Sequence, residues 1–294
     1  MHHFIYSFII VFIFTLCSTA VAQGEVVFAS GSPLSTYQSR VIYPLLKEAF
    51  KRNGVEFDAK SYPSPRSLLM SNSGALDGEL HRVYNFHEVS GGQYPNLVRI
   101  ECDLLSIYLA VFSKNADVKI VNWEQLVGSK VGFVSGKKYA ESFLGKTLKP
   151  ENIIRQSSEP NLFKMLAKGY IEYAISGGLE GKRLVLKHPD FHGIKEVGKL
   201  KETKIYAYMH KKHAALAEKV AITLIEMKKD GAFKKIVNEA RHSYCEIEDC
   251  KKMNCTYDCL NSDLVDKGNL STDPIHPNHF AQSNHSESSS HSDQ

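Results

Sequence analysis

Two α/β stretches of similar order, each followed by a β-rich run, constrain the fold of this chain most strongly. Alternating and short apolar runs predict strands at Glu25–Ala29, 55–59, 79–83, 130–134, 153–154 and 173–175. Helical spacing of apolar residues predicts helices at about 36–53 (ending at Gly54), from Ser64 through Met70, and at 139–144 and 162–168. This alternation predicts an α/β fold whose mixed sheets are flanked by helices.

The β-rich runs Leu104–Ser113 and Lys204–His210 each follow one α/β stretch, and helices are expected at about 214–229 and 233–240. Two such runs can cross between two lobes as a two-strand hinge, with a ligand cleft between the lobes. We therefore expect a discontinuous lobe 1 formed by residues 23–110 and 207–244, and a lobe 2 formed by residues 111–206.

The amino terminus has the pattern of an export signal. A nearly continuous apolar run, Ile5–Leu16, is followed by small residues that end in Ala20-Val21-Ala22. This arrangement is typical of a secretory signal peptide, so we expect residues 1–22 to be cleaved and the chain to be periplasmic. An uncleaved anchor is the alternative, and Leu16 before Cys17 is unlike a lipoprotein signal.

Composition limits the classes of partner. Lys and Arg number 36 against 32 Asp and Glu, and no basic stripe is interleaved with aromatic residues. Nucleic acid is therefore not an expected partner. We expect a monomer that binds a small polar solute and uses no cofactor.

Four segments carry a family resemblance: Ala75–Glu79, Trp123–Gly136, Phe163–Ile175 and Met227–Ile236. In this order they resemble motifs of the bacterial extracellular solute-binding protein family 3, the amino-acid-type periplasmic binding proteins. The resemblance implies a two-lobe, type II periplasmic-binding-protein-like fold. It also implies capture of a small polar, amino-acid-like or carboxylate solute, which is passed to an inner-membrane transporter or sensor.

The resemblance further implies particular roles for charged residues. In amino-acid binders of this kind, a first-lobe Arg holds the substrate carboxylate, because its planar fork matches that group. Arg82 is the candidate here and Arg66 competes with it. An Asp that would hold the ammonium is replaced by Ser176, followed by two glycines, so Glu180 is a candidate substitute.

Further candidate ligand-binding residues lie at strand and helix ends, where ligands bind in α/β sheets. After the first strand they are Ser30, Gly31, Ser32 and Tyr37. Before a helix of the second lobe they are Ser135, Gly136 and Lys137; free helix amides there can hold an anion, although family members usually have Thr or Ser where Lys137 stands. For each of these sites a plain turn, packing or a solvated charge is the alternative interpretation.

The carboxyl-terminal 50 residues, 245–294, differ in kind from the rest. Their four clustered cysteines, which we expect to form two disulfides, are Cys245, Cys250, Cys255 and Cys259, while Cys102 stands alone. Zinc binding is the alternative, but the cluster lacks close C-x-x-C pairs. The Ser- and His-rich remainder is expected to be disordered. No metal site is assigned, although His276, His279, His285 and His291 can bind a metal loosely.

Two other functional classes are kept as alternatives to a binding protein. A periplasmic, dehydratase-like enzyme on the same fold would need an acid or base in the cleft, for which the candidates are Glu79, His81, His87 and Glu180. Alternation along a strand would point either His81 or Arg82 away from the cleft. A sensory or scaffold protein would act through its Cys- and His-rich tail. No triad or metal-ligand pattern stands out, so we do not expect an enzyme.

Overall fold

The computed structural model describes residues 24–247, with side chains described as far as Tyr244. The strands are β1 (Val26–Ser30), β2 (Phe57–Ser61), β3 (Gly78–Val83), β4 (Leu97–Arg99), β5 (Leu105–Ser113), β6 (Val131–Val134), β7 (Ile153–Gln156), β8 (Tyr173–Gly177) and β9 (Lys195–His210). The α-helices are α2 (Tyr37–Arg52), α3 (Ser64–Ser73), α4 (Phe86–Val89), α5 (Lys138–Thr147), α6 (Glu159–Ala167), α7 (Gly178–Lys187), α8 (Ala214–Lys229) and α9 (Ala232–Ile247). The predictions of a signal peptide, a disulfide cluster and a disordered tail lie outside the described residues or side chains.

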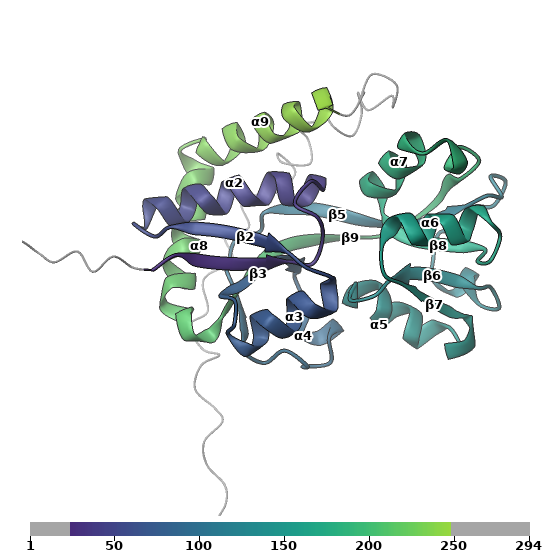
Figure 1. The fold of residues 1–294 in the computed structure, drawn as a ribbon, viewed down its shortest axis with the longest axis horizontal. Coiled ribbons are helices and arrows are strands. Elements are labelled where there is room, and N and C mark those ends of the chain that lie inside the picture. The colour runs from purple at the N-terminus through teal and green to yellow at the C-terminus, as the bar shows by residue number, and fades with distance from the viewer. Residues whose placement is uncertain (1–23, 248–294) are drawn as a thin grey trace, which may run out of the picture. The chain divides into compact units, whose positions relative to one another are not determined.

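The strands form one mixed sheet of order β2-β1-β3-β9-β5-β8-β6-β7, with β4 paired to β9. Within each half the short strands run parallel: β1 pairs with β2 and β3, and β6 pairs with β7 and β8. Strands β5 and β9 are antiparallel to each other and connect the two halves (Figure 1). We call the half with β1–β4 lobe 1 and the half with β6–β8 lobe 2. The expected mixed sheet and two crossing strands are confirmed.

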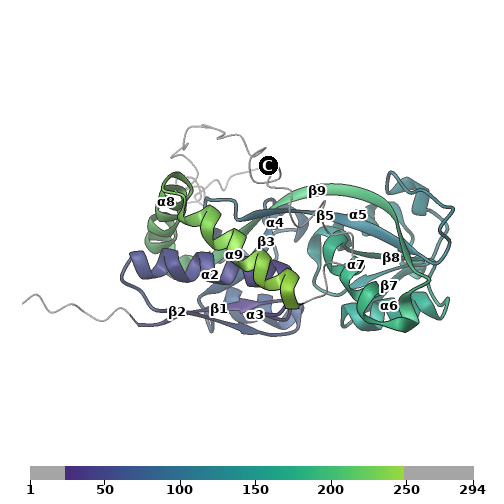
Figure 2. The same cartoon turned by 90° about the horizontal axis from the view of Figure 1, so that it is seen from above.

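Helix α2 shows how local sequence sets an element. The Thr36 hydroxyl accepts the Ser39 amide at its start, and Gly54, with φ +71°, follows its end. Its apolar residues at helical spacing are buried as the sequence predicted: Val41, Leu45, Leu46, Ala49 and Phe50. Helix α9 packs against α2 (Figure 2).

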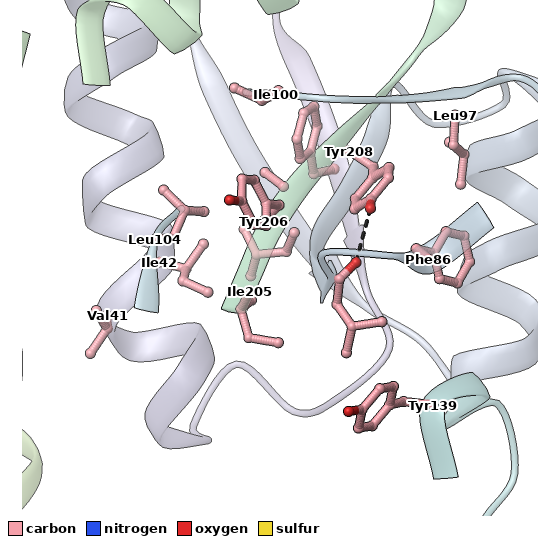
Figure 3. Packing of buried hydrophobic residues seen from close by; sticks show 14 of the residues in the cluster. Val41, Ile42, Phe86, Leu97, Ile100, Leu104, Tyr139, Ile205, Tyr206 and Tyr208 are labelled. Carbon is pink, nitrogen blue, oxygen red and sulfur yellow. Dashed lines mark hydrogen bonds between the residues drawn. The ribbon is translucent and has the colours of Figure 1, made fainter. Parts of the chain in front are cut away.

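The core of lobe 1 is rich in aromatic contacts. The rings of Phe28, Phe50 and Phe57 meet one another with centroids 4.7–5.7 Å apart. In β9, Tyr208 is 1% exposed, and its hydroxyl donates to the Val83 carbonyl oxygen at 2.9 Å (Figure 3). A buried tyrosine is tolerated because its hydroxyl has an acceptor.

Lobe 2 has a second apolar layer between its sheet and α6. Its buried members are Ala110, Phe112, Val134, Leu162, Phe163, Leu166, Ile171, Ala174, Phe191 and Ile194. Helix α7 lies so close to β5 that a Cβ on Gly178 would lie 2.0 Å from the Tyr108 ring, and one on Gly181 would lie 2.3 Å from Phe112. These two glycines are required by the close approach of the helix to the sheet.

Several elements were not predicted from the sequence. Helix α7 begins at Gly178, inside a glycine pair that resembles a turn, and α4 and β4 are very short. Strand β9 begins at Lys195 rather than near 204, because its first half is lined by exposed lysine and glutamate that hide the strand pattern. Among the described residues, no helix combines the length and apolarity needed to cross a bilayer.

Candidate functional site

Polar side chains from both lobes meet where strands of the sheet end. Ser30 ends β1 in lobe 1, whereas Lys137 follows β6, Glu159 follows β7 and Ser176 lies in β8 of lobe 2. Ligands of open α/β sheets bind at such carboxyl-terminal strand ends. Direct hydrogen bonds join the lobes here, and we call these strand-end residues, together with the residues that make those bonds, the inter-lobe contact.

Arg82 of β3 forms the largest part of this contact. Its Nε donates to Glu79 Oε2 at 2.9 Å, and its Nη2 lies 2.7 Å from the same oxygen. The Nη2 also donates to Ser67 Oγ at 3.3 Å, and Nη1 donates to Ser64 Oγ at 3.1 Å. Nη1 further reaches the Gly136 carbonyl oxygen of lobe 2 at 3.4 Å. Four hydrogen bonds and the ion pair with Glu79 therefore engage all three nitrogens of the guanidinium group.

Glu79, which was considered only as a possible catalytic acid or base, is the buried partner of this arginine. Its side chain is fully buried and also accepts hydrogen bonds from the hydroxyls of Ser67 and Ser71. Burial raises the pKa of Glu79, and the charge of Arg82 opposes that shift. The carboxylate and the guanidinium thus hold each other in a fixed orientation inside lobe 1.

Two glycines permit the close approach around Arg82. A Cβ on Gly31 would lie 2.7 Å from Arg82 Nη2, and a Cβ on Gly136 would lie 2.6 Å from Ser64 Oγ. Gly136 has φ +81°, a conformation that other residues rarely adopt. The structure therefore places the predicted residues Gly31, Gly136 and Arg82 together, with Ser64, which the sequence did not indicate.

Lys137 reaches from lobe 2 into lobe 1. Its Nζ donates to Ser32 Oγ at 3.2 Å, and the described residues place no carboxylate within 4.0 Å of it. Ser30 Oγ in turn donates to the Ser32 carbonyl oxygen at 2.7 Å. The ammonium thus lies in the inter-lobe contact with a serine hydroxyl as its hydrogen-bond partner.

Glu159 is a site residue that sequence reasoning missed. Its Oε2 accepts a hydrogen bond from Ser176 Oγ at 2.8 Å, so a carboxylate lies at the very serine that replaces the expected Asp. Burial raises the pKa of Glu159, while the positive charge of Lys137 lowers it. Its position after a strand and at the first turn of a helix, next to the capping Ser158, was the signal available in the sequence.

Glu180 of α7 makes a further direct bond between the lobes. Its Oε1 accepts the backbone N–H of Tyr37 at 2.9 Å, and its Oε2 lies 3.8 Å from Arg183 Nη1. Burial raises the pKa of Glu180, and the neighbouring charge of Glu159 adds to that rise. Glu180 therefore serves as an acceptor at the amino terminus of α2.

His81 lies beside Arg82 but has a separate environment. The pairing of β3 with β9 is irregular between Glu79 and Arg82, and such irregularities break strict alternation. The side chains of His81 and Arg82 are both largely buried, and they have different partners. His81 Nε2 lies 3.2 Å from Ser39 Oγ, and burial with the charges of Lys137 and Arg82 lowers its pKa to about 3. The ring is neutral at neutral pH.

Tyr244 of α9 touches both lobes near Glu180. Its side chain is fully buried; its ring centroid lies 5.3 Å from that of Tyr37 and 5.0 Å from the Arg183 guanidinium. Arg241 of the same helix donates to the Tyr37 hydroxyl at 3.2 Å. The carboxyl-terminal helix is thus part of the contact between the lobes, a role that its sequence did not indicate.

Two predicted residues show no side-chain bond to this cluster. Arg66 is exposed and lies over the Tyr62 ring at 5.6 Å, and for Ser135 the structure gives a backbone bond to Gln156 at 2.9 Å. A hollow of about 530 Å³ lies elsewhere, between residues 116–121 and 196–199, and none of the predicted site residues lines it.

Metal and thiol chemistry of the described part is limited. The described residues contain no group of three or more His, Cys, Asp or Glu side chains arranged to hold a metal. Cys102 is a free, buried cysteine, and burial raises the pKa of its thiol to about 11.

Known structures share this arrangement of lobes. A histidine kinase sensor domain with similarity to periplasmic binding proteins is 15% identical, with a TM-score of 0.58 over 72% of this chain and 93% of that one. An amino acid ABC transporter substrate-binding protein from Streptococcus pneumoniae bound to L-arginine is 18% identical, with a TM-score of 0.59 over 74% and 94%. An ancestral arginine-binding protein bound to arginine is 19% identical, with a TM-score of 0.59 over 74% and 98%. These likenesses establish the periplasmic-binding-protein-like fold.

Sequence comparison identifies a nearer relative. No family model matches the chain. An uncharacterized protein of Shewanella oneidensis is 30% identical over 201 residues, which cover 67% of this chain and 74% of the relative. This identity and coverage show common descent, so the chain belongs to the same family as that Shewanella oneidensis protein and has the periplasmic-binding-protein-like fold.

Proposed function

We propose that this chain is a periplasmic solute-binding protein, in which the two lobes close around a small polar, amino-acid-like or carboxylate solute. The observation that supports this most directly is the inter-lobe contact, where Arg82, Lys137, Glu159 and Glu180 gather at strand ends of both lobes. Such convergence of a few charged groups and hydroxyls fixes the orientation of a small ligand.

The fold relatives support binding rather than catalysis. Those named above are an amino acid ABC transporter substrate-binding protein, an ancestral arginine-binding protein and a histidine kinase sensor domain. His81 is neutral, and its partner Ser39 is fully buried, so this pair is unsuited to reach a substrate. A transporter or a membrane sensor is the partner we propose to receive the solute-bound form.

A sensory role is the second candidate, and Tyr244 favours it. This side chain contacts Tyr37 of lobe 1 and Arg183 of lobe 2. A change in the contact between the lobes would therefore shift helix α9, which precedes residues 248–294. Deleting residues 248–294 tests the role. Loss of a cellular response with unchanged solute affinity supports sensing through the tail, and an unchanged response contradicts it.

A thermal-shift screen of the purified mature chain tests the binding function itself. The solutes are amino acids, small carboxylates, sugars and polyamines. A solute at a hundredfold excess over its Kd stabilises the folded chain by about 2.7 kcal/mol, which raises Tm by several degrees. A selective shift that survives deletion of residues 248–294 supports the proposal. The absence of a shift with every solute contradicts it.

A further inference from the structure

We infer that Lys137 and Glu159 of lobe 2 bind the charged groups of the solute, and that Arg82 is a positioning residue that holds lobe 1 against Gly136. The inference rests on the proposed binding function and names the class of solute: a small zwitterion that carries both an anionic group and an ammonium group. It also changes which lobe recognises the anionic group, since the family resemblance assigns that group to the first-lobe arginine.

The hydrogen-bond donors of Arg82 already have partners within the protein. A bidentate clamp on a carboxylate requires two parallel N–H groups, and the Nε/Nη2 edge of Arg82 is occupied by Glu79. A solute carboxylate on this edge would have to displace Glu79, whose side chain is fully buried. An unpaired buried carboxylate is strongly unfavourable, so Glu79 competes with any solute for this edge.

The remaining edge of Arg82 faces lobe 2. Its Nη1 reaches the Gly136 carbonyl oxygen, and Ser64 Oγ donates to the same oxygen at 3.2 Å. Two lobe 1 donors thus share one lobe 2 acceptor. This geometry stabilises the contact between the lobes and fixes the turn that carries Lys137.

Lys137 retains capacity for an anionic partner. An ammonium group has three donors, and the described residues show one hydrogen bond from this one, to Ser32 Oγ. Its side chain is attached at the start of α5, whose free backbone amides also favour an anion. A carboxylate bound here needs to displace no protein carboxylate.

Glu159 supplies the opposite charge nearby. Its described hydrogen bond is from Ser176 Oγ, and an ionised carboxylate can accept about four. The positive charge of Lys137 lowers the pKa of Glu159, but its ammonium lies farther from the Glu159 carboxylate than the 4.0 Å limit of an ion pair. An ammonium and a carboxylate that are neighbours without touching are suited to a solute that places its two opposite charges between them.

Binding measurements on matched solutes test the inference. The variants are Lys137→Met, Glu159→Gln and Arg82→Lys, with Lys146→Met and Glu151→Gln as controls for loss of charge at exposed positions of lobe 2. Each of the L-amino acids that stabilises the chain is compared with its carboxamide, which lacks the carboxylate, and with its N-acetyl form, which lacks the ammonium. Titration calorimetry gives the two affinity ratios for every variant, and circular dichroism checks the fold.

We expect Lys137→Met to weaken binding of the amino acid at least tenfold and to abolish its preference over the carboxamide. Glu159→Gln should abolish the preference over the N-acetyl form. Arg82→Lys should weaken all three solutes by the same factor and keep both ratios. Should Arg82→Lys fail to fold, Ser64→Ala replaces it, since it removes one donor to Gly136, and the lobe 2 variants are unaffected.

Three results overturn the inference. If Arg82→Lys or Ser64→Ala removes the preference for the carboxylate while Lys137→Met keeps it, the arginine is the anchor and the binding function stands. If only an uncharged solute binds, the inference fails and the binding function again stands. If no solute stabilises the wild-type chain, both the inference and the proposed function fail.

Discussion

The two lobes use the same strand-end positions in different ways. In lobe 1 the charges are paired internally: Glu79 holds Arg82, and the neighbouring His81 is neutral beside Ser39. In lobe 2, Lys137 and Glu159 interact mainly with serine hydroxyls. One lobe is therefore preorganised by a buried ion pair, whereas the other keeps charges that lack a direct ionic partner.

This difference assigns stability and recognition to different lobes. The paired charges of lobe 1 hold its side chains in a single arrangement, but they leave few hydrogen-bonding groups free to bind a solute. A buried charge without an ionic partner pays a desolvation cost, and burial accordingly raises the pKa of Glu159. A protein that closes on a ligand recovers that cost when the ligand supplies the missing partner.

Replacing the two buried glutamates with glutamine should give the largest contrast between the lobes. Glu79→Gln leaves the buried Arg82 without its counter-charge and should lower the free energy of unfolding by about 3–5 kcal/mol. Glu159→Gln removes a desolvated charge with no direct ionic partner and should leave the stability unchanged or slightly higher. Urea unfolding at pH 7 measures both, with exposed Glu151→Gln as the control. Equal losses in the two variants would refute the comparison.

Tyr244 tests whether the lobes are coupled through α9. Tyr244→Ala removes a fully buried ring that contacts both lobes and should lower the free energy of unfolding by about 2–3 kcal/mol, less than a central aromatic because a helix end can adjust. Amide exchange should rise in both α9 and the first turn of α7. Tyr170→Ala, at an exposed tyrosine, is the control. A rise confined to α9 would show that the helix belongs to lobe 1 alone.

Much of the fold was predictable because local signals agreed with the final packing. The apolar period of α2 and its Gly54 stop, and the order of two α/β units with crossing strands, are local patterns that the sheet retains. Helix α7 was not predictable, because Gly177 and Gly178 indicate a turn. The small size of Gly178 is instead required by Tyr108, which is 70 residues away in sequence.

The candidate site was predictable as a set of strand ends but not as a set of pairs. The sequence identifies Arg82 and Lys137 as candidate cations, but it does not show that Arg82 is paired with Glu79. That pairing depends on the irregular register of β3, which local sequence does not reveal. Glu159 follows a strand too short to be bounded from sequence, so its distance from Ser176 emerged only from the packing of β7, β6 and β8.

Glycine substitutions separate backbone strain from lobe contact. Gly136→Ala meets both the strain of φ +81° and Ser64 of lobe 1, whereas Gly128→Ala meets φ +89° with no atom within 4 Å. We expect Gly128→Ala to cost about 1 kcal/mol and Gly136→Ala about 1–2 kcal/mol more. Small-angle scattering of the tail-deleted chain should show a larger radius of gyration only for Gly136→Ala. No difference between the variants would mean that Ser64 moves aside easily.

The smallest expected effect is an opposite pH dependence of Asp103 in lobe 1 and Glu159 in lobe 2. In lobe 1, burial would raise the pKa of Asp103, but its hydrogen bond from Lys228 outweighs this and lowers it. Its stabilisation is therefore present above the unfolded value of about 3.9 and is lost as pH falls. Glu159 has a raised pKa, so its contribution is present below about 4.3 and is lost as pH rises.

Unfolding measured from pH 2 to pH 7 resolves these two signs. The stability of the wild-type chain relative to Asp103→Asn should increase as pH rises toward about 3.9, and its stability relative to Glu159→Gln should decrease as pH rises above about 4.3. The second slope should vanish when a saturating zwitterionic solute is present, because a bound ammonium would favour the ionised Glu159 and return its pKa toward the unfolded value. Slopes of the same sign would mean that Glu159 is paired as firmly as Asp103, and the contrast between these two carboxylates would not hold.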